Sequence, residues 1–228
     1  LSTAVGDVWE CTVTPNDGDG DGGSDSASVT VISPMDGQAD WLVEDTLPQP
    51  LTSTVGAVDE SNDRLLIYGG RGYNALSDNL YEYDLSTQTW ATITPSGTAP
   101  GALFESSSVF DDTNGTMWIF GGMEYYGLTD EVFVLDASVP SAESWTLLSA
   151  TTSPEPRYGA AAAFDQTGQR MLLIGGEGYN TLYDDIWELD LTSTSSAAWT
   201  ELFPNGTGPE RAFGAAVYDP ENEAVYLI

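Results

Sequence analysis

The hydrophobic run LLIYGG at residues 65–70 returns as MWIFGG at residues 117–122 and as MLLIGG at residues 171–176. The second glycines of these runs lie at positions 70, 122 and 176, so the spacing is 52 and then 54 residues. A period of about 50 residues is typical of proteins built from repeated structural units. The sequence therefore predicts a repeat fold organised around the glycine pairs Gly69 and Gly70, Gly121 and Gly122, and Gly175 and Gly176.

Further positions keep step with the glycine pairs. In each unit an aspartate comes eleven residues before the second glycine, an aromatic residue comes eleven residues after it, and a tryptophan closes the unit. These positions are Asp59, Asp111 and Asp165; Tyr81, Phe133 and Trp187; and Trp90, Trp145 and Trp199. The segments LYEYDL, VFVLDA and IWELDL alternate apolar side chains with others, which is the period of a β-strand with one buried face. The pattern predicts units of four short strands, arranged as the blades of a β-propeller.

These repeated marks are similar to those of the kelch family, including the central domain of galactose oxidase. The resemblance implies an all-β fold in which residues 34–228 form a partial kelch β-propeller. The expected parts are three complete four-stranded blades at about 50–95, 101–150 and 156–204, a partial blade at 209–228 and an outer strand near 40–46. Arg157 and Arg211 match the arginine that often opens a kelch blade, and the corresponding places in the first two units hold Leu51 and Ala102.

Residues 1–33 lack the repeat and read as a strand, a polar loop and a second strand. This segment resembles the C-terminal end of the immunoglobulin-like or cadherin-like modules of bacterial surface proteins. That resemblance implies a disulfide between Cys11 and a partner upstream, and a buried free thiol is the alternative. In the loop, Asp17, Asp19, Asp21 and Asp25 have the spacing of a calcium loop, but Ser28 stands where an EF-hand has glutamate. A solvated hairpin turn is the other interpretation of the loop.

The charge balance restricts the possible partners. The chain has 36 acidic and five basic residues, a formal net charge of −31, no histidine and one cysteine. Such a chain repels nucleic acid and anionic membrane surfaces, and no apolar run is long enough to span a bilayer. The composition excludes histidine-based acid–base catalysis and cysteine- or histidine-rich zinc sites within this chain. We interpret it as part of an extracellular protein, either secreted or displayed on the cell surface.

The loops between the second and third strands should share one face with the connections between blades. A candidate ligand-binding face therefore consists of Arg71, Tyr73, Asn74, Glu124, Tyr125, Tyr126, Arg157, Glu177, Tyr179, Asn180 and Arg211. Tyrosines beside amide and guanidinium groups suit sugar stacking or peptide capture. Because three of the tyrosines recur at one offset, packing of each blade on the next is the alternative. The recurrent aspartates are expected to cap turns, so no catalytic residue is assigned.

The leading functional hypothesis is a non-catalytic propeller that binds a protein or a glycan, with no cofactor or with calcium at the acidic loop. One alternative is a fragment of a galactose-oxidase-like or other carbohydrate-active enzyme whose catalytic residues lie outside this chain. A structural stalk segment is the second alternative. An incomplete ring would leave sheet edges unpaired, so this segment by itself is expected to be poorly stable or to self-associate.

Overall fold

The structure is a computed structural model, and it describes residues 8–13, 25–30, 47–205, 208 and 210–228. The chain divides into two compact units, residues 1–44 and 45–228. In the first unit, β1 (Val8–Val13) pairs with the antiparallel β2 (Asp25–Thr30). The two strands predicted on either side of the acidic loop are therefore present. Asp17, Asp19, Asp21 and the outer strand expected near 40–46 lie outside the described residues.

The second unit contains a series of antiparallel sheets, which we call blades 1 to 4. Blade 1 consists of β3 (Val55–Asp59), β4 (Arg64–Tyr68), β5 (Leu80–Asp84) and β6 (Thr89–Ile93), with a 3-10 turn, η1 (Glu60–Asn62), after β3. Blade 2 consists of β8 (Ser107–Asp111), β9 (Thr116–Phe120), β10 (Val132–Asp136) and β11 (Ser144–Leu148). Blade 3 consists of β12 (Ala161–Asp165), β13 (Arg170–Ile174), β14 (Ile186–Asp190) and β15 (Ala198–Leu202). Blade 4 begins with β16 (Ala216–Asp219) and β17 (Ala224–Leu227).

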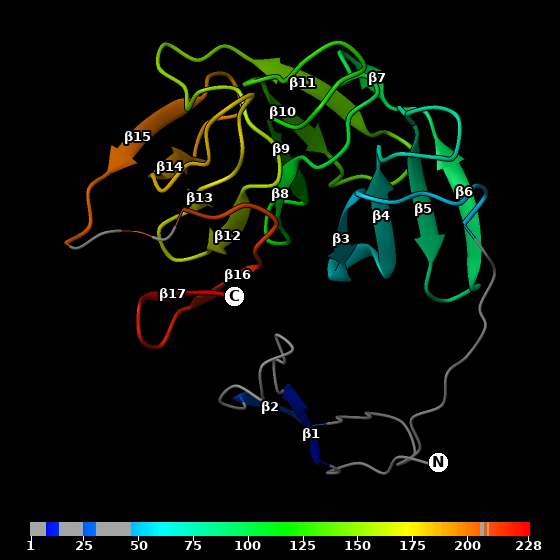
Figure 1. Cartoon of the computed structure of the whole chain (residues 1–228). Coiled ribbons are helices and arrows are strands. Elements are labelled where there is room, and N and C mark those ends of the chain that lie inside the picture. Colours follow the sequence, from blue (N-terminus) through cyan, green and yellow to red (C-terminus); the bar gives the residue numbers. More distant parts are fainter. Residues whose placement is uncertain (1–7, 14–24, 31–46, 206–207, 209) are drawn as a thin grey trace. The chain divides into compact units, whose positions relative to one another are not determined.

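Figure 1 shows the four sheets following one another around an arc, from blade 1 to blade 4. Equivalent backbone groups link the segments that lead into the innermost strands. The N–H of Glu105 donates to the carbonyl of Ser53 (3.0 Å), that of Gly159 to Glu105 (2.8 Å), and that of Phe213 to Gly159 (2.7 Å). Each of these residues lies six positions before the aspartate that ends its inner strand. The repetition confirms the predicted all-β partial propeller. Among the described residues, no helix is long and apolar enough to cross a bilayer.

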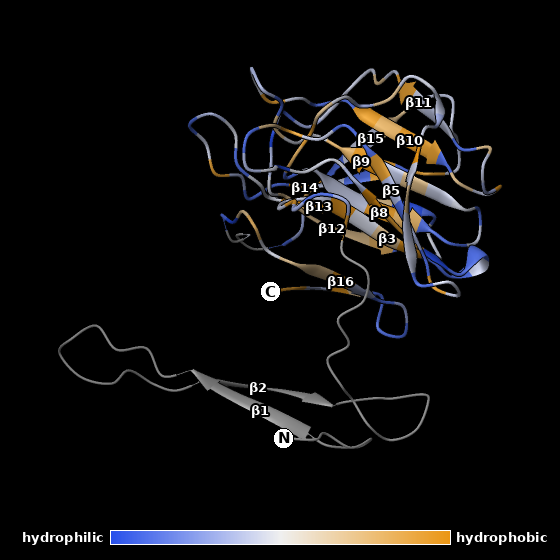
Figure 2. Cartoon of the chain, turned by 90° about the vertical axis from the view of Figure 1, so that its right-hand side faces the viewer, coloured by the Kyte–Doolittle hydropathy of each residue, from blue (hydrophilic) through white to orange (hydrophobic). Residues whose placement is uncertain are grey.

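Blade 2 is buried on both of its faces. From β9, Met117 and Ile119 join the hydrophobic cluster shared with blade 1, whereas Trp118 and Phe120 join the cluster shared with blade 3. Alternate strand side chains point to opposite faces, so one five-residue strand supplies both interfaces. Figure 2 shows the hydrophobic colouring concentrated on strands such as β9 and β10 and the hydrophilic colouring in the connecting loops.

The closing tryptophans join neighbouring blades. Trp145 of blade 2 packs against Tyr68 of blade 1, and Trp199 of blade 3 packs against Phe120 of blade 2, each with ring centroids 4.9 Å apart. In blades 2 and 3 the repeat thus places the tryptophan of the outer strand on the second strand of the preceding blade, whereas Trp90 of blade 1 contacts Tyr83 of its own blade. Outside these aromatic contacts, the linker before blade 2 adds β7 (Ser96–Gly97), which runs parallel to β11.

The glycine pairs lie where each blade meets the opening of the next. In blade 2, Gly121 has a φ of +64°, and a Cβ there would lie 2.6 Å from the carbonyl oxygen of Arg157. The N–H of Gly122 donates to the same carbonyl at 2.8 Å. In blade 1 the carbonyl that receives the glycine N–H belongs to Leu103. Leu103, and not Ala102, is therefore the residue of blade 2 that corresponds to Arg157 and Arg211.

Candidate interaction surface

The loops between the second and third strands of blades 1, 2 and 3 close in the same way. A backbone hydrogen bond spans four residues in each, from Gly72 N to Ala75 O (2.9 Å), from Glu124 N to Gly127 O (2.8 Å) and from Gly178 N to Thr181 O (2.8 Å). This bond, from the N–H of the first residue to the carbonyl of the fourth, closes a tight hairpin loop whose two central residues form the tip. In all three loops the first central residue is a tyrosine: Tyr73, Tyr125 and Tyr179.

The turn geometry leaves these tyrosines in solvent. Tyr73 is fully exposed, Tyr125 is 76 % exposed and Tyr179 is 72 % exposed. Tyr126, the second central residue of its turn, is 94 % exposed. Four large aromatic side chains at three loop tips are an unusual feature of a solvent-exposed surface, because burial of such side chains is favourable.

The linkers that open the blades lie beside these loops. Isolated antiparallel β-bridges join Thr52 to Arg71, Phe104 to Met123, and Tyr158 to Glu177. Loops 71–76, 123–128 and 177–182 therefore form one continuous surface with the linkers. We call this surface, with its four exposed tyrosines, the tyrosine face.

The tyrosines do not all have the same surroundings. The hydroxyl of Tyr179 accepts a hydrogen bond from the N–H of Leu128 at 2.9 Å and so ties the loop of blade 3 to that of blade 2. Tyr125 and Tyr126 contact each other edge to face, with centroids 4.8 Å apart. Blade packing therefore accounts for part of the position of Tyr179, but not for the fully exposed Tyr73.

A cavity of about 350 Å³ lies on the tyrosine face between the loops of blades 1 and 2. Tyr73 and Asn74 line it from one loop, and Glu124 and Tyr125 line it from the other. The guanidinium of Arg71 also lies there, with its central carbon 5.8 Å from the centroid of the Phe104 ring. Asn180 is exposed on blade 3 beside Tyr179.

Three residues expected on this face are partly or wholly inside the protein. Arg157 is buried, with Nη2 2.8 Å from Oδ2 of Asp185, Nη1 2.9 Å from the carbonyl of Gly175, and its central carbon 3.9 Å from the centroid of the Tyr183 ring. These contacts make Arg157 an internal brace of blade 3. Arg211 is half-buried, and its carbonyl accepts the N–H of Gly176 at 2.7 Å. Glu177 is also half-buried.

Comparison with known proteins gives the family. The model of the KLHDC2/KLHL20/DRC7 Kelch-repeats domain matches residues 18–227. The chain belongs to the kelch-repeat family. A solved structure, that of YjhT, shares the fold with a TM-score of 0.59 at 17 % identity, covering 89 % of this kelch chain and 61 % of YjhT.

Curated kelch relatives are similar over part of their length. Human Kelch domain-containing protein 3 is 29 % identical over 169 residues, which is 67 % of this chain and 42 % of that protein. Adagio protein 3 of Arabidopsis thaliana is 29 % identical over 154 residues, 65 % of this chain and 24 % of that protein. Multiple epidermal growth factor-like domains protein 8 of Mus musculus is 28 % identical over 121 residues, 49 % of this chain and 4 % of that protein. The kelch chain thus spans less than half of the length of these relatives.

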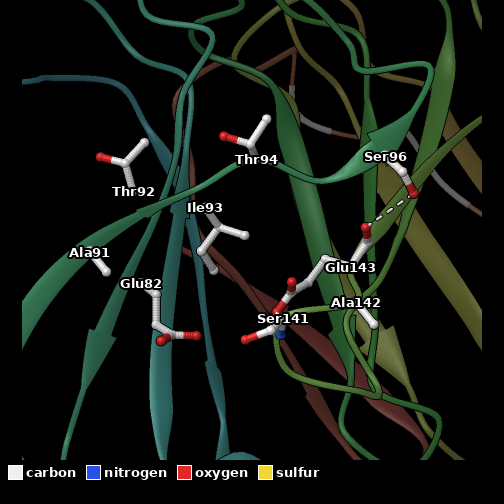
Figure 3. A pocket seen from close by; sticks show the side chains of 9 residues that line it. All are labelled: Glu82, Ala91, Thr92, Ile93, Thr94, Ser96, Ser141, Ala142 and Glu143. Atoms are coloured by element: carbon white, nitrogen blue, oxygen red, sulfur yellow. Dashed lines mark hydrogen bonds between the residues drawn. The ribbon is translucent and has the colours of Figure 1, made fainter.

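A second, larger cavity of about 630 Å³ lies at the outer rim between kelch blades 1 and 2 (Figure 3). The side chains of Glu82 and Glu143 point toward one another there, and both accept hydrogen bonds from Nη1 of Arg64 at 2.7 Å. Arg64 also donates from Nε to Asp59 (2.8 Å) and from Nη2 to the carbonyl of Ala137 (2.7 Å). Because Glu143 and Ala137 belong to blade 2, this cluster joins two blades.

Arg64 stays ionised in its cluster with Asp59, Glu82 and Glu143. Burial by itself would lower the pKa of Arg64, but its hydrogen bonds to Glu143, Glu82 and Asp59 outweigh burial and raise that pKa. The guanidinium therefore keeps its charge at any ordinary pH. The sequence analysis missed this cluster, although Arg64 and Arg170 share one repeat offset, as do Glu82 and Glu188.

The recurrent aspartates of the kelch blades cap turns, as expected. Oδ1 of Asp111 accepts the N–H of Thr113 at 3.0 Å, and Oδ1 of Asp165 accepts that of Gly168 at 2.8 Å. Burial opposes ionisation of Asp165, but the hydrogen bonds from Gly168, Arg170 and Tyr218 prevail and lower its pKa. The equivalent Asp59 and Asp219 bond in the same way to the backbone of the following turn. These carboxylates therefore have a structural role, which is to cap the turns that follow the inner strands.

Proposed function

We propose that this kelch chain is a non-catalytic binding module that holds a protein ligand on the tyrosine face. The observation that carries the proposal is the repeated placement of a tyrosine at a solvent-exposed turn tip, from 72 % to 100 % exposed, in three successive blades. Tyrosine provides a large contact area at a small cost in conformational entropy, and it is enriched among the residues that dominate binding energy. The cavity beside Tyr73 and Tyr125 provides the concave part of the surface.

Two facts support binding over catalysis. The chain has no histidine, and the capping aspartates are held by turn hydrogen bonds. Copper content and oxidase activity, measured on the full-length protein, test the galactose-oxidase-like alternative. A stoichiometric copper ion with oxidase turnover would favour that enzyme and contradict the binding-only proposal.

Replacing Tyr73 and Tyr125 together with alanine is expected to weaken ligand binding at least ~10-fold, since truncation of a central interface aromatic costs about 2 kcal/mol or more. Peptide ligands selected on the wild-type protein from a random display library are the probe, and fluorescence anisotropy gives their Kd. Tyr226→Ala is the matched control, because Tyr226 is also exposed but lies on β17, away from the loop tips. Equal losses in both variants would contradict the proposal.

Glycans are the other ligand class that tyrosine rings suit. A glycan array probed with the same two variants separates the classes. Binding of one glycan that is lost in the Tyr73→Ala and Tyr125→Ala double variant, without selected peptides, would replace the protein ligand by a sugar.

We also propose that the module is displayed outside the cell. The absence of lysine and the net charge of −31 support solubility in a salt-rich or calcium-rich exterior. Residues 1–33 would then belong to an immunoglobulin-like or cadherin-like module, with calcium on Asp17, Asp19, Asp21 and Asp25 and a disulfide from Cys11. Calorimetric titration with Ca²⁺ should show one site that Asp19→Asn abolishes. The same heat from the variant would rule out that site, and protease treatment of intact cells tests the location.

A further inference from the structure

The arginines of the described residues are mostly committed to internal pairs. Arg64, Arg157 and Arg170 form all of the salt bridges found in the part of the chain that the structure describes. Arg71 lies on the tyrosine face, but its guanidinium is placed over Phe104 and forms no salt bridge there. Among the described residues, the carboxylates of this face therefore form no salt bridge.

Blade 2 lacks the internal brace that blade 3 has. In blade 3, the carbonyl of Asp185 accepts the N–H of Gly175, and its carboxylate is held by Arg157. In blade 2, the carbonyl of Glu131 accepts the N–H of Gly121 in the same way, but Leu103 stands at the arginine position. Glu131 thus occupies the place of a neutralised carboxylate without its cation.

The surroundings of Glu131 increase the uncompensated charge. Glu131 is exposed, and it lies near the carboxylates of Glu124 and Asp130. Partial burial, together with repulsion from Glu124 and Asp130, raises the pKa of Glu131. Glu131 is thus repelled by two neighbouring carboxylates, Glu124 and Asp130.

An aromatic surface stands beside this negative charge. Tyr125 follows Glu124 in the turn and lines the cavity of about 350 Å³ together with Tyr73. A cation over a tyrosine ring is attracted by the negative face of the ring, and a neighbouring carboxylate adds to that attraction. An aromatic ring bordered by carboxylates is the chemistry that receives an ammonium or guanidinium group.

We propose that the tyrosine face binds a basic segment of a partner protein, and that a lysine or arginine side chain of the partner lies against Tyr125 with its charge on Glu124, Asp130 and Glu131. This inference rests on the proposed function and names the class of partner.

The test uses the full chain and three synthetic peptides of equal length, one rich in lysine and arginine, one with glutamate in place of each basic residue, and one with glutamine there. Anisotropy titrations should show binding of the basic peptide that weakens as salt rises. A variant combining Glu124→Gln, Asp130→Asn and Glu131→Gln should lose at least ~10-fold in affinity, through three lost charge contacts. Tyr125→Ala should also lose affinity, and Tyr125→Phe should keep it because the ring remains.

The matched control removes three exposed carboxylates from the connections that follow the inner strands. It combines Glu60→Gln, Asp63→Asn and Glu221→Gln, so its net charge equals that of the first variant. A loss below ~3-fold in the control supports a defined site, since distant exposed charges are largely screened. Equal losses in both variants would show general attraction to an acidic protein and overturn the proposal. If the neutral or acidic peptide binds in a manner that requires Tyr125 and the basic one does not, the binding face stands and the basic partner is wrong.

Discussion

Arg64→Ala is expected to destabilise the protein by about 3–5 kcal/mol, because removal of one partner from a buried ion cluster leaves its counter-charges unpaired. The side chain of Arg64 is 2 % exposed, and those of Asp59 and Glu143 are 0 % and 1 % exposed. Each of these carboxylates would lose its cation while staying out of water. The substitution would also weaken the contact between blades 1 and 2, because Glu143 and the Ala137 carbonyl of blade 2 accept hydrogen bonds from Arg64.

The chain contains its own control for this prediction. Arg170 occupies the same place in blade 3, with Nε 2.7 Å from Asp165 and Nη1 2.6 Å from Glu188. The side chain of Arg170 is 39 % exposed and that of Glu188 is 27 % exposed, so solvent screens these charges more than those around Arg64. Asp165, however, is 2 % exposed and would lose its cation. Arg170→Ala is therefore expected to cost about 1–2 kcal/mol, less than Arg64→Ala.

Urea unfolding of the two variants, followed by tryptophan fluorescence, gives the difference. Arg64→Lys should be intermediate, because lysine keeps the charge but cannot supply the forked donors that reach four acceptors. If Arg64→Ala and Arg170→Ala lower the free energy of unfolding by the same amount, the contacts of Arg64 with blade 2 contribute nothing to stability. The cluster would then not hold blades 1 and 2 together.

The fold could be read from the sequence because its determinants recur. Each glycine pair, each aromatic and each closing tryptophan serves one local position in a blade, so three copies at constant offsets define the unit. Leu103 lies eight positions before Asp111, as Arg157 lies before Asp165, so the match of Ala102 to Arg157 was off by one residue. The hydrogen bond from Gly70 to the Leu103 carbonyl agrees with the corrected alignment.

The site was less predictable than the fold, for a physical reason. The tyrosine tips follow from local turns, and the sequence therefore indicated them. Burial of Arg157 depends on Asp185 and Tyr183, which lie in the next hairpin, and the cluster at Arg64 requires Glu143, 79 residues away in another blade. A contact between repeats that is made in one repeat only does not recur at a fixed spacing, so the repeat pattern cannot reveal it.

The second large effect concerns the first glycine of each pair. Gly121→Ala is expected to cost about 2–5 kcal/mol, of which about 1–2 comes from the left-handed backbone and about 1–3 from overpacking. The φ of +64° is unfavourable for any residue with a Cβ, and here that Cβ would lie 2.6 Å from the Arg157 carbonyl oxygen. Backbone cannot move aside as a flexible side chain can. The hydrogen bond from Gly122 to the same carbonyl would be strained as well.

Gly101→Ala separates the two contributions. Gly101 has a φ of +81°, but a Cβ there would meet no heavy atom within 4 Å. This variant should therefore show the backbone cost alone, about 1–2 kcal/mol. At roughly 2–4 °C per kcal/mol for a domain of this size, calorimetry should find the melting temperature of Gly121→Ala several degrees below that of Gly101→Ala. Equal melting temperatures would mean that Gly121 is needed only for its positive φ. A lower melting temperature for Gly121→Ala would mean that glycine is also needed for the close approach of backbone between blades. The double glycine would then be the contact that sets the spacing of the blades.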